Sequence, residues 1–88
     1  MIVQRNEATD TLTRHGRTAL LLDNGTVVLL NELSAAIYAL SREPIDVYAL
    51  VSPLEEEFGA PEGRSTINAT QDAVAELIHH GILRPTAG

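Results

Sequence analysis

A tight turn between two aliphatic runs constrains the fold of this chain more than any other feature. The turn reads Asp23-Asn24-Gly25, and such residues accept the positive φ angles that short hairpin loops require. The runs on either side, Thr18 to Leu22 and Thr26 to Leu30, are rich in β-branched and aliphatic side chains. This pattern predicts a β-hairpin. Ile2 and Val3 open a shorter apolar stretch, so we expect a three-stranded antiparallel sheet.

The residues after the hairpin predict a first helix. An apolar face with the spacing i, i+3, i+4 and i+7 is formed by Leu33, Ala36, Ile37 and Leu40. Asn31 is a plausible N-cap because its side chain can accept hydrogen bonds from the first free N–H groups of the helix. We therefore expect a helix from Glu32 to Leu40, broken by Arg42-Glu43-Pro44.

A second helix is predicted from Val47 to Phe58, with Asp46 as a candidate cap and Gly59 just beyond its end. Pro53 lies inside this segment and should kink or restart the helix, since proline removes one helix hydrogen bond. Ser52-Pro53-Leu54-Glu55 has the Ser-x-x-Glu form of a capping box, which favours a restart there.

A third helix is predicted from Ser65 to His80, closed by Gly81, after which Ile82 and Leu83 should return to the core. Its apolar stripe is interrupted at Thr70 and Gln71, and this gap could line a groove. The tail from Arg84 to Gly88 is expected to fray. The expected fold is therefore α+β: a three-stranded antiparallel sheet followed by three helices, winged helix-turn-helix-like, in a single domain of residues 1–88 with a flexible tail at 84–88.

Composition limits where such a chain works and what chemistry it can perform. Hydrophobic residues make up 44% of the chain, which fits a folded domain, and cysteine is absent. The lack of disulfides and of an apolar N-terminal run leads us to expect a cytoplasmic protein with no membrane contact. His79 and His80 are neighbours and Glu55-Glu56-Glu57 are consecutive, so neither set converges on a metal. No nucleophile motif or phosphate loop is present, and we expect neither catalysis nor a cofactor.

The predicted order of strands and helices is also the outline of a DNA-binding winged helix. The charge argues against that function, because the formal net charge is −6 and the predicted third helix contains no lysine or arginine. A winged-helix transcriptional regulator remains the main alternative. A third possibility is a plain interaction or antitoxin-like adaptor.

Three segments together resemble the PqqD family, whose members are RiPP recognition elements. The run from Leu20 to Ile37 looks like the family's hairpin, which ends in Leu-Asn before a helix with small residues and an apolar anchor. Ile45 to Phe58 resembles the family's second helix, and Asp72 to Leu83 its terminal Leu-x-x-x-Gly-Leu-Leu run. The resemblance covers Thr18 to Leu83. Pro53 and the Arg42 to Pro44 segment depart from the family pattern.

This resemblance implies a peptide-binding function. The domain would hold the leader of a ribosomally synthesised, post-translationally modified peptide precursor and present it to a modifying enzyme. The partner would be a radical SAM enzyme, a cyclase or a leader peptidase. If Thr26 to Leu30 forms a sheet edge, an extended leader can add to it as a further strand.

The expected peptide-binding residues lie on that strand and on the third helix. They are Thr26, Val27, Val28, Leu29, Leu30, Asn68, Gln71, Asp72 and Ala75. Val28, Leu30, Asn68, Gln71 and Ala75 are expected to wall pockets between the strand and the helix. Alternation along the strand makes either Val28 and Leu30, or Val27 and Leu29, part of the core. Proline at Val28 is expected to remove an N–H used by the peptide.

Overall fold

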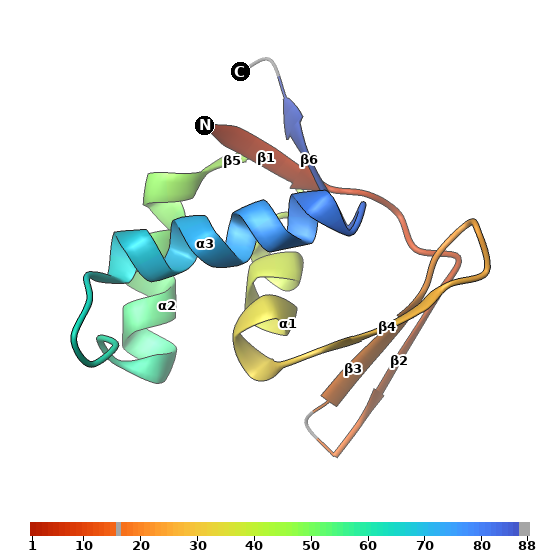
Figure 1. The fold of residues 1–88 in the computed structure, drawn as a ribbon, viewed down its shortest axis with the longest axis horizontal. Helices are drawn as coiled ribbons and strands as arrows, with labels where there is room; N and C mark the ends of the chain where they lie inside the picture. Colours follow the sequence, from red (N-terminus) through yellow and green to blue (C-terminus); the bar gives the residue numbers. More distant parts are fainter. Residues whose placement is uncertain (16, 87–88) are drawn as a thin grey trace.

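The computed structural model describes residues 1–15 and 17–86, which form an α+β fold of two three-stranded antiparallel sheets and three α-helices (Figure 1). One sheet has the strand order β2-β3-β4 and the other β5-β1-β6. The strands are β1 (Ile2–Arg5), β2 (Asp10–Arg14), β3 (Arg17–Leu21), β4 (Val27–Leu30), β5 (Ile45–Asp46) and β6 (Leu83–Thr86). The helices are α1 (Glu32–Leu40), the 3-10 helix η1 (Val47–Leu50), α2 (Val51–Phe58) and α3 (Thr66–His79).

The predicted hairpin is confirmed as β3 and β4, joined by the loop Asp23-Asn24-Gly25. The Leu22 N–H donates to the Thr26 carbonyl at 2.9 Å, and the Gly25 N–H donates to the Leu22 carbonyl at 2.9 Å. Gly25 has a φ of 84°, a conformation that glycine adopts without steric cost. The third strand of this sheet is β2 and not the Ile2-Val3 stretch, which lies in β1 of the other sheet.

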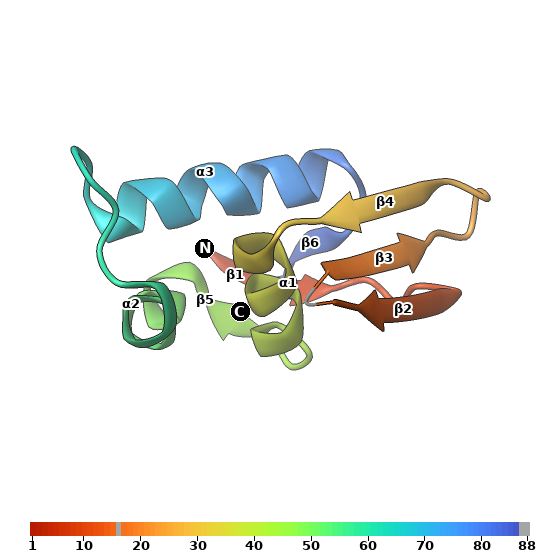
Figure 2. The same ribbon diagram turned by 90° about the horizontal axis from the view of Figure 1, so that it is seen from below.

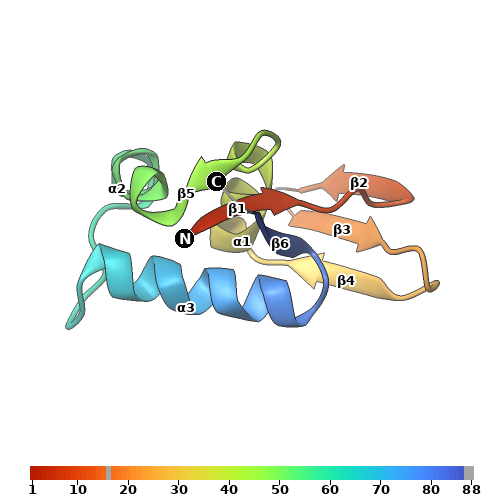
Figure 3. The same ribbon diagram turned by 90° about the horizontal axis from the view of Figure 1, so that it is seen from above.

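The second sheet joins the two ends of the described chain, with β1 at its centre between β5 and β6 (Figures 1 and 3). The expectation of a frayed tail is therefore wrong for residues 84–86, and residues 87–88 lie outside the described part. Arg84 helps to hold the tail against β1, because its guanidinium donates to the Arg5 carbonyl at 3.0 Å and to Gln4 Oε1 at 2.8 Å. The expected succession of one sheet and then three helices also needs correction, since β5 and β6 fall between and after the helices.

The first helix has the predicted limits and the predicted cap. Asn31 Oδ1 accepts from the Ser34 N–H at 2.8 Å, and α1 runs from Glu32 to Leu40. Its buried side chains, Ile37 and Tyr38, face the core. α1 lies against the inner face of the β2-β3-β4 sheet and joins that sheet to the other helices (Figure 1).

The second predicted helix is divided at Val51 rather than at Pro53. Asp46 caps η1 by accepting from the Tyr48 N–H at 2.9 Å, as predicted. α2 begins directly after η1 without a side-chain cap, so the expected Ser52-Pro53-Leu54-Glu55 capping box is wrong. Pro53 occupies the third residue of α2, where the N–H has no partner within the helix, and it therefore removes no helix hydrogen bond.

α3 packs its central face onto a core to which both sheets and all the helices contribute. Ser65 caps α3, and the Ile82 N–H donates to the Leu77 carbonyl at 2.9 Å beyond Gly81. Ile82 and Leu83 are buried, as predicted. The core is aliphatic apart from Tyr38 and comprises Val3, Leu20, Leu30, Ile37, Tyr38, Val47, Leu50, Leu54, Val74, Leu77, Ile82 and Leu83. Within the described part of the chain, every helix falls short of the length and apolar character needed to cross a membrane.

Candidate functional site

β4 is an edge strand with one buried and one exposed face. Leu30 is 5% exposed and Val28 packs against the core, so the Val28 and Leu30 set forms the inner face. Val27 is 63% and Leu29 76% exposed, and both lie on the outer face. Four consecutive aliphatic residues therefore form a strand at the margin of a sheet (Figure 2). The side chains of two of them, Val27 and Leu29, are exposed.

The hydrogen-bond phase of the hairpin decides which backbone groups of β4 face outward. The bond from the Leu22 N–H to the Thr26 carbonyl makes these residues a hydrogen-bonded pair, and such pairs alternate along an antiparallel ladder. Val28 pairs with Leu20 and Leu30 with Thr18, so these two residues of β4 bond to β3.

The N–H and C=O groups of Val27 and Leu29 consequently point away from β3, and we call these four groups the β4 edge. The sequence-based assignment of Val28 as an edge-facing residue is wrong by one position. Thr26 also bonds inward: its carbonyl accepts from Leu22, and its N–H donates to Asn24 Oδ1 at 2.9 Å.

The other margins of the two sheets carry features that discourage strand addition. β5 has only two residues, one of them Asp46, and β2 carries Asp10 and Arg14. In β6, the bond from the Asn6 N–H to the Ile82 carbonyl sets the ladder phase so that Pro85 lies at an outward position, where it has no N–H to offer. Charge, proline and short length are the usual protections of an edge. β4 has none of the three.

The helix residues that were expected to face β4 lie in two different surroundings along α3: Gln71 and Ala75 border a cavity, whereas Asn68 and Asp72 are exposed. Gln71 and Ala75 line an apolar cavity of about 420 Å³ together with Met1, Val47, Tyr48, Val74, Ile78 and Pro85, and no residue of β4 lines it. Leu30 is buried in the core. The expected pocket that would combine Leu30 with Gln71 and Ala75 is therefore wrong.

The two residues of the predicted gap in the apolar stripe of α3, Thr70 and Gln71, also have different surroundings. Gln71 borders the 420 Å³ cavity, as a groove-lining residue would. Thr70 is buried, and its hydroxyl donates to the Thr66 carbonyl at 2.8 Å.

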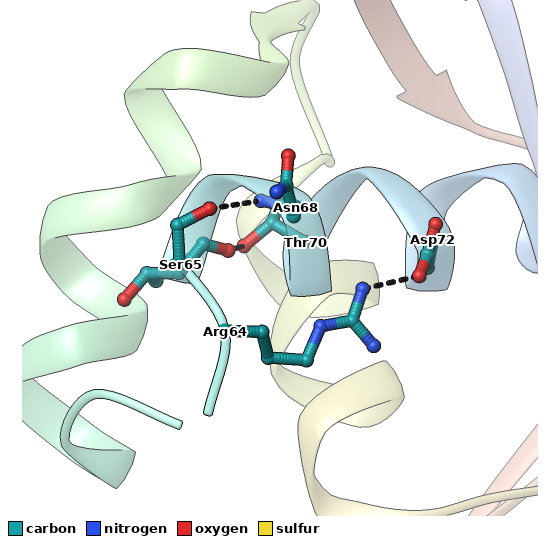
Figure 4. A network of polar contacts seen from close by, with 6 residues as sticks. Arg64, Ser65, Asn68, Thr70 and Asp72 are labelled. Carbon is teal, nitrogen blue, oxygen red and sulfur yellow. Dashed lines mark hydrogen bonds and ion pairs between the residues drawn. The ribbon is translucent and has the colours of Figure 1, made fainter. Parts of the chain in front are cut away.

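Asn68 and Asp72 belong to a polar network at the N-terminal half of α3 (Figure 4). Ser65 Oγ accepts from the Asn68 N–H at 3.2 Å, so Asn68 contributes its backbone to the cap. The side chain of Arg64 lies along the helix and pairs with the Asp72 carboxylate. Both side chains are exposed, but Asp72 already has a cationic partner within the chain.

The flank of α3 that carries Ala73, Glu76 and the C-cap residue His80 reaches the hairpin through His80. The sequence analysis missed these three residues. Ala73 packs against the core, and His80 Nε2 lies 3.9 Å from Glu76 Oε1. His80 also lines a polar cavity of about 390 Å³ with the hairpin residues Leu22, Asp23 and Asn24. The helical period places these residues on one flank of the core stripe and Gln71 and Ala75 on the other, but it does not say which flank meets β4.

The arrangement offers groups for binding rather than a set of converging reactive groups. Among residues 1–15 and 17–86, no three His, Asp or Glu side chains are grouped so that they could hold a metal ion. Glu55, Glu56 and Glu57 are exposed on α2, and His79 and His80 are exposed at the C-terminal end of α3. What the described part of the site presents is an open strand edge bordered by apolar side chains.

Comparison with protein-family models, with curated proteins and with solved structures found no match to this chain.

Proposed function

We propose that this protein is a PqqD-like RiPP recognition element, a winged-helix-like module that binds the leader segment of a ribosomally synthesised, post-translationally modified peptide precursor. The leader adds to β4 as a further antiparallel strand. The bound precursor is then presented to a modifying enzyme, namely a radical SAM enzyme, a cyclase or a leader peptidase. The sequence resemblance from Thr18 to Leu83 suggests the family, and the geometry of β4 supports the binding mode.

The single observation that carries the proposal is the unprotected β4 edge. A free aliphatic edge invites aggregation unless it has a partner, and the other three edge strands in the described part of the chain are protected. Val27 and Leu29 together offer two N–H donors and two C=O acceptors, which an extended peptide can satisfy with its own backbone. Main-chain pairing would supply affinity without dependence on leader sequence.

Side chains around the edge would supply specificity. Alternate residues of an added strand would lie beside Val27 and Leu29 on the outer face, so we expect apolar leader residues at two positions spaced i and i+2. The other alternate residues would point toward the α3 flank of Ala73, Glu76 and His80. Because a single added strand makes a small contact, we expect its affinity to depend on a few well-buried leader side chains.

The charge of the protein does not favour the alternative of DNA binding. A recognition helix needs cationic side chains near the phosphates, yet α3 carries Asp72 and Glu76 and no lysine or arginine. An adaptor that binds a folded partner would not need an open strand edge, and this distinguishes it from the leader-binding function.

Amide-shift mapping by NMR tests the proposal, with synthetic leader peptides of precursors encoded beside this gene as probes. We expect shifts at Val27 to Leu30 and at the α3 flank of Ala73, Glu76 and His80. Leu29→Pro should weaken binding while the fold persists, because it removes an outward N–H. Glu55→Ala, on the exposed face of α2, is the control and should leave affinity unchanged. Shifts confined to α2 or to the N-terminal half of α3 would contradict strand addition at β4.

A further inference from the structure

The outer face of the β2-β3-β4 sheet is an apolar surface that no element among residues 1–15 and 17–86 covers. Residues directly opposite each other on neighbouring strands share a face, and the pairs Leu12 with Ala19, Ala19 with Leu29, and Leu21 with Val27 place five apolar residues on this one. Leu12 is 58% exposed and, with Val27 and Leu29, supplies half of the large hydrophobic side chains that are exposed in the described chain. Figure 1 shows α1 on the opposite side of the sheet and no described element on this side.

Charged residues lie at the two ends of this apolar face with opposite signs. Asp10 is opposite Leu21 at the end near the hairpin loop, and it is exposed. Arg14 and Arg17 are directly opposite each other at the other end, and both are exposed. Two like charges in one cross-strand pair repel each other, so an acidic group from outside would relieve this end of the sheet.

A second copy of the chain fits this pattern of charge. In a symmetric face-to-face pair the two-fold axis lies in the interface. If the axis runs across the strands, each copy's Asp10 meets Arg14 and Arg17 of its partner, while the two apolar centres cover each other. If the axis runs along the strands, like charges meet. The charge pattern therefore favours one orientation of the axis.

We propose that the protein forms a homodimer through the outer face of the β2-β3-β4 sheet, with Asp10 of each copy against Arg14 and Arg17 of the other. Two sheets packed face to face in this way form a small sandwich. The β4 edge then lies at the margin of the interface. The dimer uses the side chains of the sheet face, whereas a leader pairs with the outward backbone groups of Val27 and Leu29, so the dimer leaves these backbone groups open.

The size of the face makes this dimer weak. Three strands of four or five residues cover roughly 14 Å by 15 Å at the usual strand spacing and rise. This is well below the ~800 Å² that each partner contributes to a standard interface. Association should therefore depend on concentration, and it should become measurable between about 0.1 and 1 mM, as for other small, transient contacts.

Sedimentation equilibrium from about 10 µM to 1 mM tests the dimer. We expect the average mass to rise with concentration for the unaltered chain, and Leu12→Glu to weaken association at least about tenfold, since a charge replaces a central apolar contact. Tyr48→Glu is the matched control, because Tyr48 is 64% exposed and lies on η1, away from this face. It introduces the same charge and should leave the association unchanged.

A constant monomer mass up to 1 mM would overturn the proposal. So would an unchanged dimer in Leu12→Glu, which would indicate pairing elsewhere, such as at the β4 edge. Leu12 is exposed on β2, two strands from that edge, so loss of the dimer in this variant leaves leader binding intact and the two proposals fail separately.

Charge exchange tests the orientation. The experiment uses about 20 mM salt, where charges act over more than ~10 Å. One variant carries Asp10→Arg, and the other carries both Arg14→Asp and Arg17→Asp. Each variant by itself should associate about tenfold more weakly than the unaltered chain. An equimolar mixture should regain dimers, because each contact then joins opposite charges. A mixture that associates no better than its separate components would overturn the proposed orientation.

Discussion

Two proline substitutions in β4 separate the backbone groups that hold the sheet together from those that face outward. Val28→Pro removes a hydrogen bond to Leu20 on β3 and leaves a carbonyl of the ladder without its donor, which costs about 1–3 kcal/mol. The half-buried Val28 side chain also loses part of its packing, about 0.5–1 kcal/mol on the scale of one methylene group. Leu29→Pro removes an N–H that faces solvent and a side chain that is 76% exposed.

The two variants should therefore differ in free energy of unfolding by about 2 kcal/mol. A domain of 88 residues has a total stability of about 4–13 kcal/mol, so this difference is a large share of it. Urea unfolding followed by far-UV circular dichroism measures it directly. With a slope of about 1 kcal/mol per molar urea, the midpoint of Val28→Pro should fall about 2 M below that of Leu29→Pro.

Equal midpoints for the two variants would refute the assigned hydrogen-bond phase. A lower midpoint for Leu29→Pro would mean that Leu29 bonds to β3 and that Val28 faces outward. Either result would remove the outward groups of Val27 and Leu29 on which the proposed binding mode depends.

Three further results are expected. Leu20→Ala should lower the free energy of unfolding by about 2–5 kcal/mol, because Leu20 is fully buried. Leu12→Ala, on the exposed face, should change it by less than about 0.5 kcal/mol. Calorimetry of both variants provides the comparison. Asn31→Ala should cost about 0.5–2 kcal/mol and increase hydrogen exchange at the Ser34 amide, which loses its acceptor. DNA affinity at physiological salt should be no better than the ~10⁻⁴ to 10⁻⁶ M of non-specific binding, and a tight sequence-selective gel shift would argue for the regulator instead.

Residues that act within a few positions of each other were predictable from the sequence. The hairpin follows from Asp23-Asn24-Gly25, whose backbone preferences are local, and the start of α1 follows from the Asn31 side chain reaching Ser34. The length of the hairpin loop also sets which residues of β4 bond to β3. The outward position of Val27 and Leu29, rather than Val28, was therefore predictable from the loop length.

Contacts between distant parts of the chain could be decided only by the tertiary structure. The Arg84 bond to Gln4 spans 80 positions and orders a tail that local propensity leaves free. The sequence separates the two flanks of α3, but only packing places the Ala73, Glu76 and His80 flank toward the hairpin and Gln71 with Ala75 toward Tyr48. Whether β4 lies at an edge is decided the same way, because β1 pairs with β5 and β6 in the other sheet and does not add to β4. The local pattern determines what each segment is, and the shared core determines which of its faces remains free to bind.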